Sequence, residues 1–163
     1  MPASTNVNMR TVVHASSNGI ATAFPDVCNT PSPAGPIPIP YPNIAMSSDT
    51  AQGSSTVQID GNPVMIQGAN FSTSTGDEAG SAGGVVSGVT KGKAEFILYS
   101  FDVQIEGKNV PRMGDLMVQN IGGSPNTPPM PEMQPPNPMI PSVVAEQEDK
   151  EEDDEIVKIE IVE

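Results

Sequence analysis

His14 and Cys28 are the two side chains of this sequence best suited to bind a metal or to act as a nucleophile, and the chain has one residue of each type. A closed zinc site needs about four ligands. His14 and Cys28 supply two, and Asp26 or Asp115 would have to supply others. The incomplete set favours a second interpretation, in which Cys28 is a small buried residue. Cysteine catalysis is disfavoured, because no third orienting group or oxyanion-hole motif is recognisable.

Two further patterns are weak matches to ligand sites. Thr75-Gly76-Asp77-Glu78 contains two adjacent acids, but a calcium loop needs oxygen ligands at alternating positions. A turn in which Asp77 caps local backbone donors is the better account. Gly83-Gly84 is not followed by the Lys-Ser or Lys-Thr of a phosphate-binding loop. The residues themselves therefore predict no catalytic group and no organic cofactor.

The charge of the chain is strongly acidic, with a formal net charge of −13 and only seven Lys and Arg residues. Phosphate contacts need basic side chains, so direct binding of nucleic acid is disfavoured. The N-terminus has no basic stretch followed by an apolar run, and no apolar stretch is long enough to span a bilayer. We therefore expect a protein made in the cytoplasm without a signal peptide, which would need another route than general secretion to leave the cell.

The composition predicts a mainly β fold of short strands. Aromatic residues make up 4% of the chain, there is no Trp, and there are 15 Gly and 18 Pro. The segment 24–43 has proline at alternate positions from Pro36 to Pro42, which predicts an extended polyproline-like strap on the surface. The segment 93–103 is the most hydrophobic strand candidate, and we expect it to supply much of the core.

A repeated hairpin is the clearest internal pattern. Residues 57–64 (VQIDGNPV) align without gaps to residues 103–110 (VQIEGKNV), with five of eight positions identical. Asp60-Gly61 and Glu106-Gly107 occupy the same place in the two copies, and Asp-Gly is a strong signal for a two-residue turn. The repeat predicts two hairpins of the same design in one β architecture.

The sequence changes character after the hairpins. We divide it into a body at 1–122, a linker rich in Pro and Met at 123–145, and an acidic tail at 146–163. The tail holds ten carboxylates and two lysines. It is expected to be flexible, and it ends in a β-branched segment that is either a solubilising extension or a docking strand for an effector or chaperone. The candidate docking residues are Ile156, Val157, Ile159, Ile161 and Val162.

Residues 10–120 resemble the PAAR-like domain family of type VI secretion and related contractile injection systems. The resemblance is carried by FPDVCNTPSPAGPIPIPYPNIAMSSD, STGDEAG, GVVSG, KGKAEF, YSFDVQIEGKNVPRMGDLM and QN, in that order. It implies a compact β cone that sits on the end of a trimeric VgrG-type spike, one cap per trimer. It also implies export with the spike, transient contact with a target membrane, attachment of effectors, and a structural role without a reaction.

The resemblance also implies a metal near the point of the cone, because PAAR tips of the best-known kind bind zinc through three histidines and one cysteine. In this chain only His14 and Cys28 are available for that set. After Gly114-Asp115, where a ligand would be expected, the chain offers Gln119 and Asn120. We keep two alternatives to the cap, a toxin-delivery module and an effector adaptor that binds cargo through its tail.

Overall fold

The computed structural model describes residues 3–135, and the predictions for residues 1–2 and 136–163 lie outside this range. One unit runs from Ala3 to Gln134, and a second begins at Pro135. Within residues 3–135 there is no α-helix, and hence no helix able to cross a membrane. The elements are β1 Asn6–Val7, β2 Arg10–Thr11, β3 Ile20–Thr30, β4 Ile37–Met46, the 3-10 turn η1 Ser47–Asp49, β5 Thr50–Ala51, β6 Gln58–Ile59, β7 Asn62–Pro63, β8 Asn70–Phe71, β9 Ser74–Thr75, β10 Lys93–Phe96, β11 Gln104–Ile105, β12 Lys108–Asn109, β13 Leu116–Ile121 and β14 Met130–Met133. The predicted mainly β class is confirmed.

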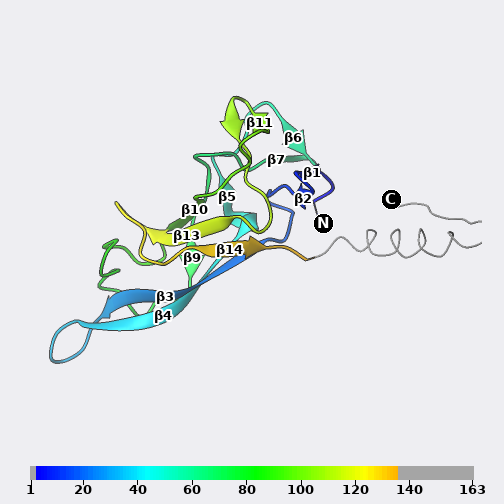
Figure 1. The fold of residues 1–163 in the computed structure, drawn as a ribbon. Helices are drawn as coiled ribbons and strands as arrows, with labels where there is room; N and C mark the ends of the chain where they lie inside the picture. The colour runs from blue at the N-terminus through cyan, green and yellow to red at the C-terminus, as the bar shows by residue number, and fades with distance from the viewer. Residues whose placement is uncertain (1–2, 136–163) are drawn as a thin grey trace, which may run out of the picture. The chain divides into compact units, whose positions relative to one another are not determined.

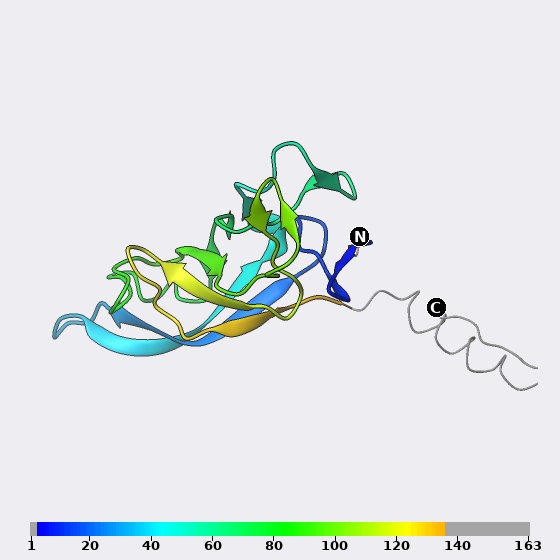
Figure 2. The ribbon, with the colours of Figure 1, turned by 45° about the horizontal axis from the view of Figure 1, so that its top comes forward.

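The largest element is an eight-stranded sheet in the order β5-β8-β10-β13-β14-β3-β4-β9. Its pairings are antiparallel, and β3 with β4 forms a long ribbon. The ribbon's turn lies at one end of the described unit, and the short hairpins β1–β2, β6–β7 and β11–β12 gather at the other (Figures 1 and 2). The sheet thus connects two ends that differ in construction.

The proline-rich segment is part of the sheet, and not a separate strap. Residues Ile37 to Met46 form β4 and pair with β3. The β3 partners of Pro38 and Pro40 are Asn29 and Val27, whose backbone groups bond instead to the loop 82–85. At these positions the backbone nitrogen of β4 faces away from β3, so no hydrogen bond to β3 is lost by having proline there. The N–H groups that proline lacks would have lain on the open edge of the sheet. Such an edge is a poor template for another strand.

The core lies between the hairpin end and the sheet, and it is made of small aliphatic residues with few rings. Phe71 and Phe96 meet edge to face, with ring centroids 6.0 Å apart. The strand predicted at 93–103 is shorter than expected, because β10 ends at Phe96 and the next residues, Ile97 and Leu98, are exposed. The core residues are Ala3, Val7, Val12, Val13, Ala21, Ala45, Val64, Met65, Ile66, Ala69, Phe71, Ala94, Phe96, Val110 and Met117.

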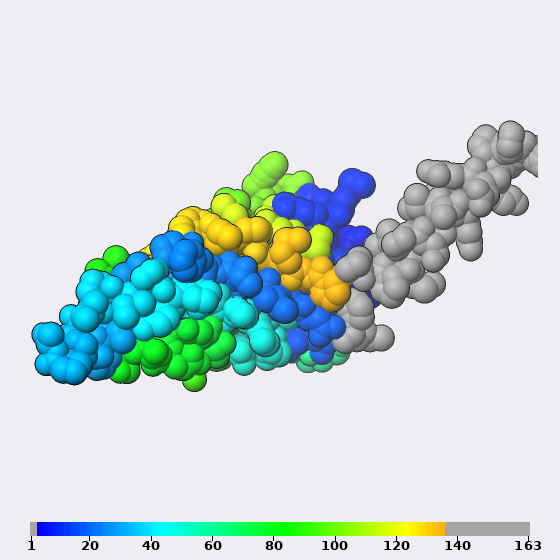
Figure 3. All heavy atoms as spheres, turned by 90° about the horizontal axis from the view of Figure 1, so that it is seen from below, coloured from blue at the N-terminus to red at the C-terminus, as the bar shows by residue number. Residues whose placement is uncertain are grey.

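The folded body extends further than the predicted boundary at residue 122. β14 lies inside the segment assigned to the linker at 123–145, and it pairs with β13 on one side and β3 on the other. Within β14 the side chain of Glu132 points inward and is fully buried. Composition alone could not reveal this, because three of the four residues that pair are Met130, Pro131 and Met133, which are also typical of a linker rich in Pro and Met. In Figure 3 the outer face of β14, β3 and β4 forms one continuous strip.

Glu132 has an unusual environment for a carboxyl group. Burial raises its pKa to about 8, and the nearby charge of Asp115 acts in the same direction. Gln134 Nε2 lies 3.4 Å from Glu132 Oε2, a weak contact that lowers the pKa only in part. Gly19 packs against the carboxyl group, and any side chain at that position would collide with it. Glu132 is therefore protonated at neutral pH in the folded protein.

Replacing Glu132 with Gln tests this account. A carboxyl group whose pKa is higher in the folded state than in the unfolded state stabilises the fold fully only below the unfolded value, near 4.5. That contribution is lost as pH rises toward about 8. We expect the Tm of Glu132→Gln to exceed that of the wild type at pH 8 and the gap to close near pH 4.5. A gap of constant size across this range would contradict the burial argument.

Candidate functional site

Three hairpins at one end of the unit share the same design. The strands β1–β2, β6–β7 and β11–β12 each pair through two residues per strand. Each turn has two central residues with positive φ, the geometry of a type I′ turn. The first of them is Asn8 (φ 52°), Asp60 (φ 54°) or Glu106 (φ 56°), and the second is Met9, Gly61 or Gly107. The two predicted hairpins are confirmed, and the hairpin at Asn6–Thr11 is a third copy.

The third copy lacks the features that identify the other two. Its turn is Asn8-Met9, without glycine, and Asn accepts the left-handed conformation more readily than most residues. What the three copies share is the residue that follows the second strand. This residue is Val12, Val64 or Val110, and each is fully buried. A search for valine at this spacing after a turn would have found the third copy.

The turn side chain of each hairpin contacts the segment before another hairpin. Glu106 accepts hydrogen bonds from the backbone N–H groups of residues 55–57, at 2.6 Å from Thr56 N. Asp60 accepts one from Ser4 N at 2.9 Å and another from the Ser4 hydroxyl. Asn8 Nδ2 donates to Asp102 Oδ1 at 3.1 Å. The contacts run from the third hairpin to the second, from the second to the first, and from the first to the third.

The backbone closes the same ring. Val12 forms a bridge with Arg112, and Val64 forms one with His14. The third link is the hydrogen bond from Gln67 N to Asn109 O, at 2.9 Å. In each case the segment after one hairpin contacts the strand or the segment after another. We call the three hairpins and these links the hairpin ring.

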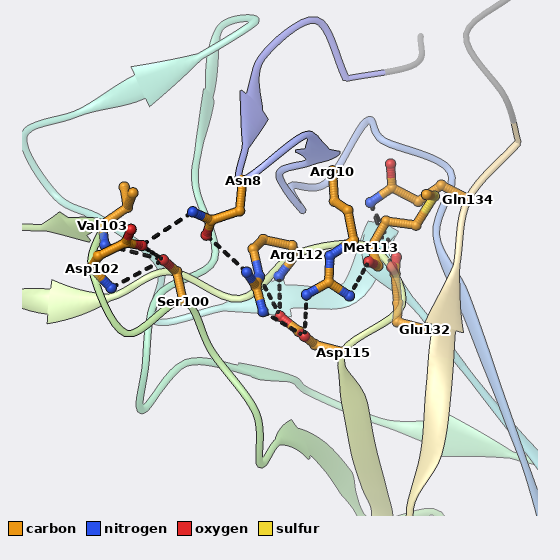
Figure 4. A network of polar contacts seen from close by, with 10 residues as sticks. All are labelled: Asn8, Arg10, Ser100, Asp102, Val103, Arg112, Met113, Asp115, Glu132 and Gln134. Atoms are coloured by element: carbon orange, nitrogen blue, oxygen red, sulfur yellow. Dashed lines mark hydrogen bonds and ion pairs between the residues drawn. The ribbon is translucent and has the colours of Figure 1, made fainter.

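Figure 4 shows how the first and third hairpins are joined by charge. Arg112 donates to Asn8 Oδ1 at 2.8 Å and, through Nε, to Asp115 Oδ2 at 2.9 Å. Arg10 donates to the other oxygen of Asp115 at 3.2 Å. The Asp115 carboxylate is buried and forms ion pairs with both arginines. It is occupied by these pairs, and the structure does not bring it to Cys28 as a metal ligand.

The outer surface of the ring carries two prominent apolar side chains. Met9, in the first turn, is 94% exposed, and Phe101, ahead of the third hairpin, is 83% exposed. Phe101 also borders a shallow hollow whose other lining residues are Asn8, Tyr99, Asp102 and Arg112. Apolar surface of this kind marks an interaction site where it is contiguous. The ring therefore combines three equivalent turns with a hollow between two of them that Phe101 borders.

His14 and Cys28 lie in different polar groups. His14 is buried beside the ring, where Nε2 is 2.9 Å from Asp60 Oδ2 and Nδ1 accepts a hydrogen bond from Ser16 N at 3.0 Å. Both ring nitrogens are therefore engaged. Because Nδ1 accepts, Nε2 donates to Asp60. No contact links His14 to Cys28 within residues 3–135, and His14 serves to join the first two hairpins.

Cys28 lies in a buried cluster with Asp26 and Asp77, in which one ligand atom from each residue lies within 4.8 Å of the others. Burial, followed by the two carboxylates, raises the pKa of the Cys28 thiol to about 12. A thiol with so high a pKa carries almost no thiolate at neutral pH and is a poor nucleophile. We call these three residues, with Asn120 and Asn126, the Cys28 cluster.

Part of this cluster is visible in the sequence. Asp77 does accept a hydrogen bond from a backbone donor, Lys91 N at 3.2 Å, but it also lies beside Cys28. The sequence offers Asn120 only as a weak substitute for a ligand, and nothing in it singles out Asn126. Their amides contact Asp26 and Cys28 across about a hundred residues of sequence.

The tail residues Ile156, Val157, Ile159, Ile161 and Val162 lie outside the described residues.

Comparison with known proteins gives two matches. Residues 19–129 match the model of a toxin PAAR-like domain. A curated protein of Pseudomonas aeruginosa, named DNase toxin Tse7, is 42% identical over 129 residues, which cover 74% of this chain and 33% of that protein. The chain thus aligns with about a third of the length of this relative. No solved structure matches the chain.

The relative overturns one prediction. The sequence predicts a structural protein without a reaction, whereas a protein 42% identical to it is named a DNase toxin. The prediction comes from the family resemblance, which implies a structural role without a reaction. The alignment covers a third of the relative.

Removing Glu106 tests the hairpin ring. In Glu106→Ala the amide groups of residues 55–57 lose their acceptor, and we expect a Tm several degrees below that of the wild type. Hydrogen bonds from the Thr56 amide and hydroxyl, and then from Ser55, lower the pKa of Glu106 to about 2, so the difference should persist at pH 4. Glu95→Ala is the matched control, because Glu95 makes only a surface pair with Lys93. Equal Tm values for the two variants would contradict a bracing role for Glu106.

Proposed function

This chain belongs to the toxin PAAR-like family, and we propose that it is the carrier module of a toxin-delivery assembly. In this proposal it binds the end of a trimeric VgrG-type spike through the hairpin ring and links a toxin activity to that spike. The assembly is a type VI or related contractile injection system, and the module leaves the producing cell with the spike. The closed ring of three equivalent hairpins is the observation that carries the proposal.

The ring suits a partner with three-fold symmetry. A trimeric spike presents three equivalent surfaces around its axis. One chain can match them only if it offers three similar surfaces in a closed arrangement, and the ring does so with Asn8, Asp60 and Glu106 in equivalent turns. This supports a stoichiometry of one module per trimer. Met9 and Phe101 supply apolar contact area of the kind that anchors protein interfaces.

The kind of toxin activity is inferred from the name of the relative. The protein from Pseudomonas aeruginosa is named a DNase toxin, so we propose that the activity linked to this module is a nuclease. The module itself suits carriage better than contact with DNA. Its sequence has a net charge of −13 and seven basic residues, and two of these, Arg10 and Arg112, pair with Asp115.

Two substitutions on the ring test the docking. The double variant Met9→Ser, Phe101→Ser removes exposed apolar area without touching the buried core, so its Tm should equal that of the wild type. We expect binding to the cognate trimeric spike, measured by interferometry, to weaken at least tenfold, because buried apolar anchors dominate interface energies. Light scattering of the wild-type complex should give one chain per trimer.

Val86→Ser is the matched control. Val86 is also an exposed apolar residue, but it lies on the loop next to the Cys28 cluster, far along the sheet from the ring. The Val86→Ser variant should bind the spike as tightly as the wild type does. Equal loss of binding in the control, or no loss in the double variant, would remove the ring as the docking surface.

The tail provides a separate attachment point in this proposal. Deleting residues 142–163 removes Ile156, Val157, Ile159, Ile161 and Val162, the proposed strand for an effector or chaperone. We expect the truncated protein to bind the spike normally and to stop the export of one effector, scored by mass spectrometry of the secreted fraction. Unchanged export of every effector would leave the tail as a solubilising extension.

A further inference from the structure

The Cys28 cluster gathers three acidic groups in the interior without a basic partner. Asp26, Cys28 and Asp77 are all fully buried, and none has a Lys or Arg side chain among its hydrogen bonds within residues 3–135. Charges of one sign cannot be buried together at low cost. Either a cation or bound protons must therefore neutralise the cluster.

A zinc ion, which the family resemblance implies, does not fit this donor set. The best-known set is three histidines and one cysteine, and here the histidine of the chain is engaged with Asp60 and Ser16. What surrounds Cys28 is two carboxyl groups and two amides. The question is then which atoms the amides direct at the cluster.

The orientation of both amides is fixed by backbone donors. Asn120 Oδ1 accepts a hydrogen bond from Gly92 N at 2.8 Å. Asn126 Oδ1 accepts two, from Val86 N at 2.9 Å and Ser87 N at 3.1 Å. Rotating either amide by 180° would set an NH₂ group against these N–H donors. The amide oxygens are therefore directed away from the cluster, and the nitrogens toward it.

The amide nitrogens lie beside the cluster, where a bound cation would be repelled by their N–H groups. Asn120 Nδ2 donates to Asp26 Oδ1 at 3.1 Å and lies 3.7 Å from Cys28 Sγ. Asn126 Nδ2 also donates to Asp26 Oδ1. These N–H groups point their positive ends at Asp26 Oδ1 and Cys28 Sγ, two of the atoms that would ligate a metal. Two glycines pack closely against the cluster, because a Cβ at Gly80 would collide with Cys28 and one at Gly84 with Asn126.

One atom of the cluster has no partner. Asp26 Oδ2 is buried and accepts no hydrogen bond. The donor it lacks can come from Asp77, because a carboxylate oxygen of Asp77 lies within 4.8 Å of one of Asp26. Burial, followed by the interaction with Asp26, raises the pKa of Asp77 to about 7. An Asp77 carboxyl that keeps its proton turns two repelling carboxylates into a hydrogen-bonded pair.

We propose that Asp26 and Asp77 share one proton, with the Asp77 carboxylic acid donating to Asp26 Oδ2, and that this bond replaces the metal of the family at this site. The thiol of Cys28 also keeps its proton. One negative charge then remains, and the two amides of Asn120 and Asn126 stabilise it. The pair joins β3 to the loop that precedes β10, so this end of the ribbon is held without a bound ion.

Metal analysis and one isosteric substitution test the proposal. Plasma mass spectrometry of the full chain, purified without chelator and then incubated with Zn²⁺ and desalted, should give far less than one metal per chain. Addition of EDTA should leave the Tm unchanged. Asp77→Asn keeps an N–H donor for Asp26 and an oxygen for Lys91 N, so its Tm should stay within about 2 °C of the wild type. Asp77→Ala removes both and should lower the Tm by about 5 °C or more.

A spectroscopic measurement detects the proton itself. Infrared spectra at pH 6 should show a protonated carboxyl band that Asp77→Asn removes. The comparison is made in the Glu132→Gln background, because Glu132 would contribute a band of its own. One equivalent of zinc per chain, lost together with stability in Asp77→Asn, would overturn the proposal, and so would an infrared spectrum without the band. Neither result depends on whether the hairpin ring binds a spike.

Discussion

Two-residue strands are too short to persist alone in water, and the whole hairpin end of this protein is made of them. Their stability has to come from one another. Each turn directs a polar side chain to the backbone or side chain ahead of another hairpin, and the ring closes after three such steps. Because the links are polar and lie at the rim, Val12, Val64 and Val110 can turn inward and form the core beneath. The core and the turn chemistry therefore depend on the closure of one ring.

The sequence predicts those parts of the fold that have local signals. Asp60-Gly61 and Glu106-Gly107 carry the preference for positive φ in their own residues, so two of the three hairpins follow from residue type and spacing. Asn8-Met9 adopts the same turn without a glycine, so its local signal is weaker: Asn8 accepts positive φ, and Val12 follows at the same spacing as Val64 and Val110. The prolines of β4 indicate, by residue type, a segment that cannot pair. Their missing N–H groups in fact fall on the open edge, and this depends on which neighbour each residue faces.

The Cys28 cluster is less predictable, because it is assembled from distant segments. Residue type identifies Cys28, and local turn chemistry identifies Asp77 as a cap. Asn120 and Asn126 become important only because backbone groups at Gly92, Val86 and Ser87 orient their amides. Residue type alone predicts that Cys28 and His14 belong to one metal site. The fold instead places His14 against Asp60, where it joins two hairpins.

The position of β14 sets the order in which the molecule can be built. This strand lies between β13 and β3, and its pairing of Met133 with Ile20 joins residues more than a hundred positions apart. During synthesis the ribbon of β3 and β4 therefore waits with one long edge unpaired until almost the whole body has left the ribosome. Long-range pairing of this kind makes folding slow. The body therefore reaches its final form late, when β14 inserts between β13 and β3.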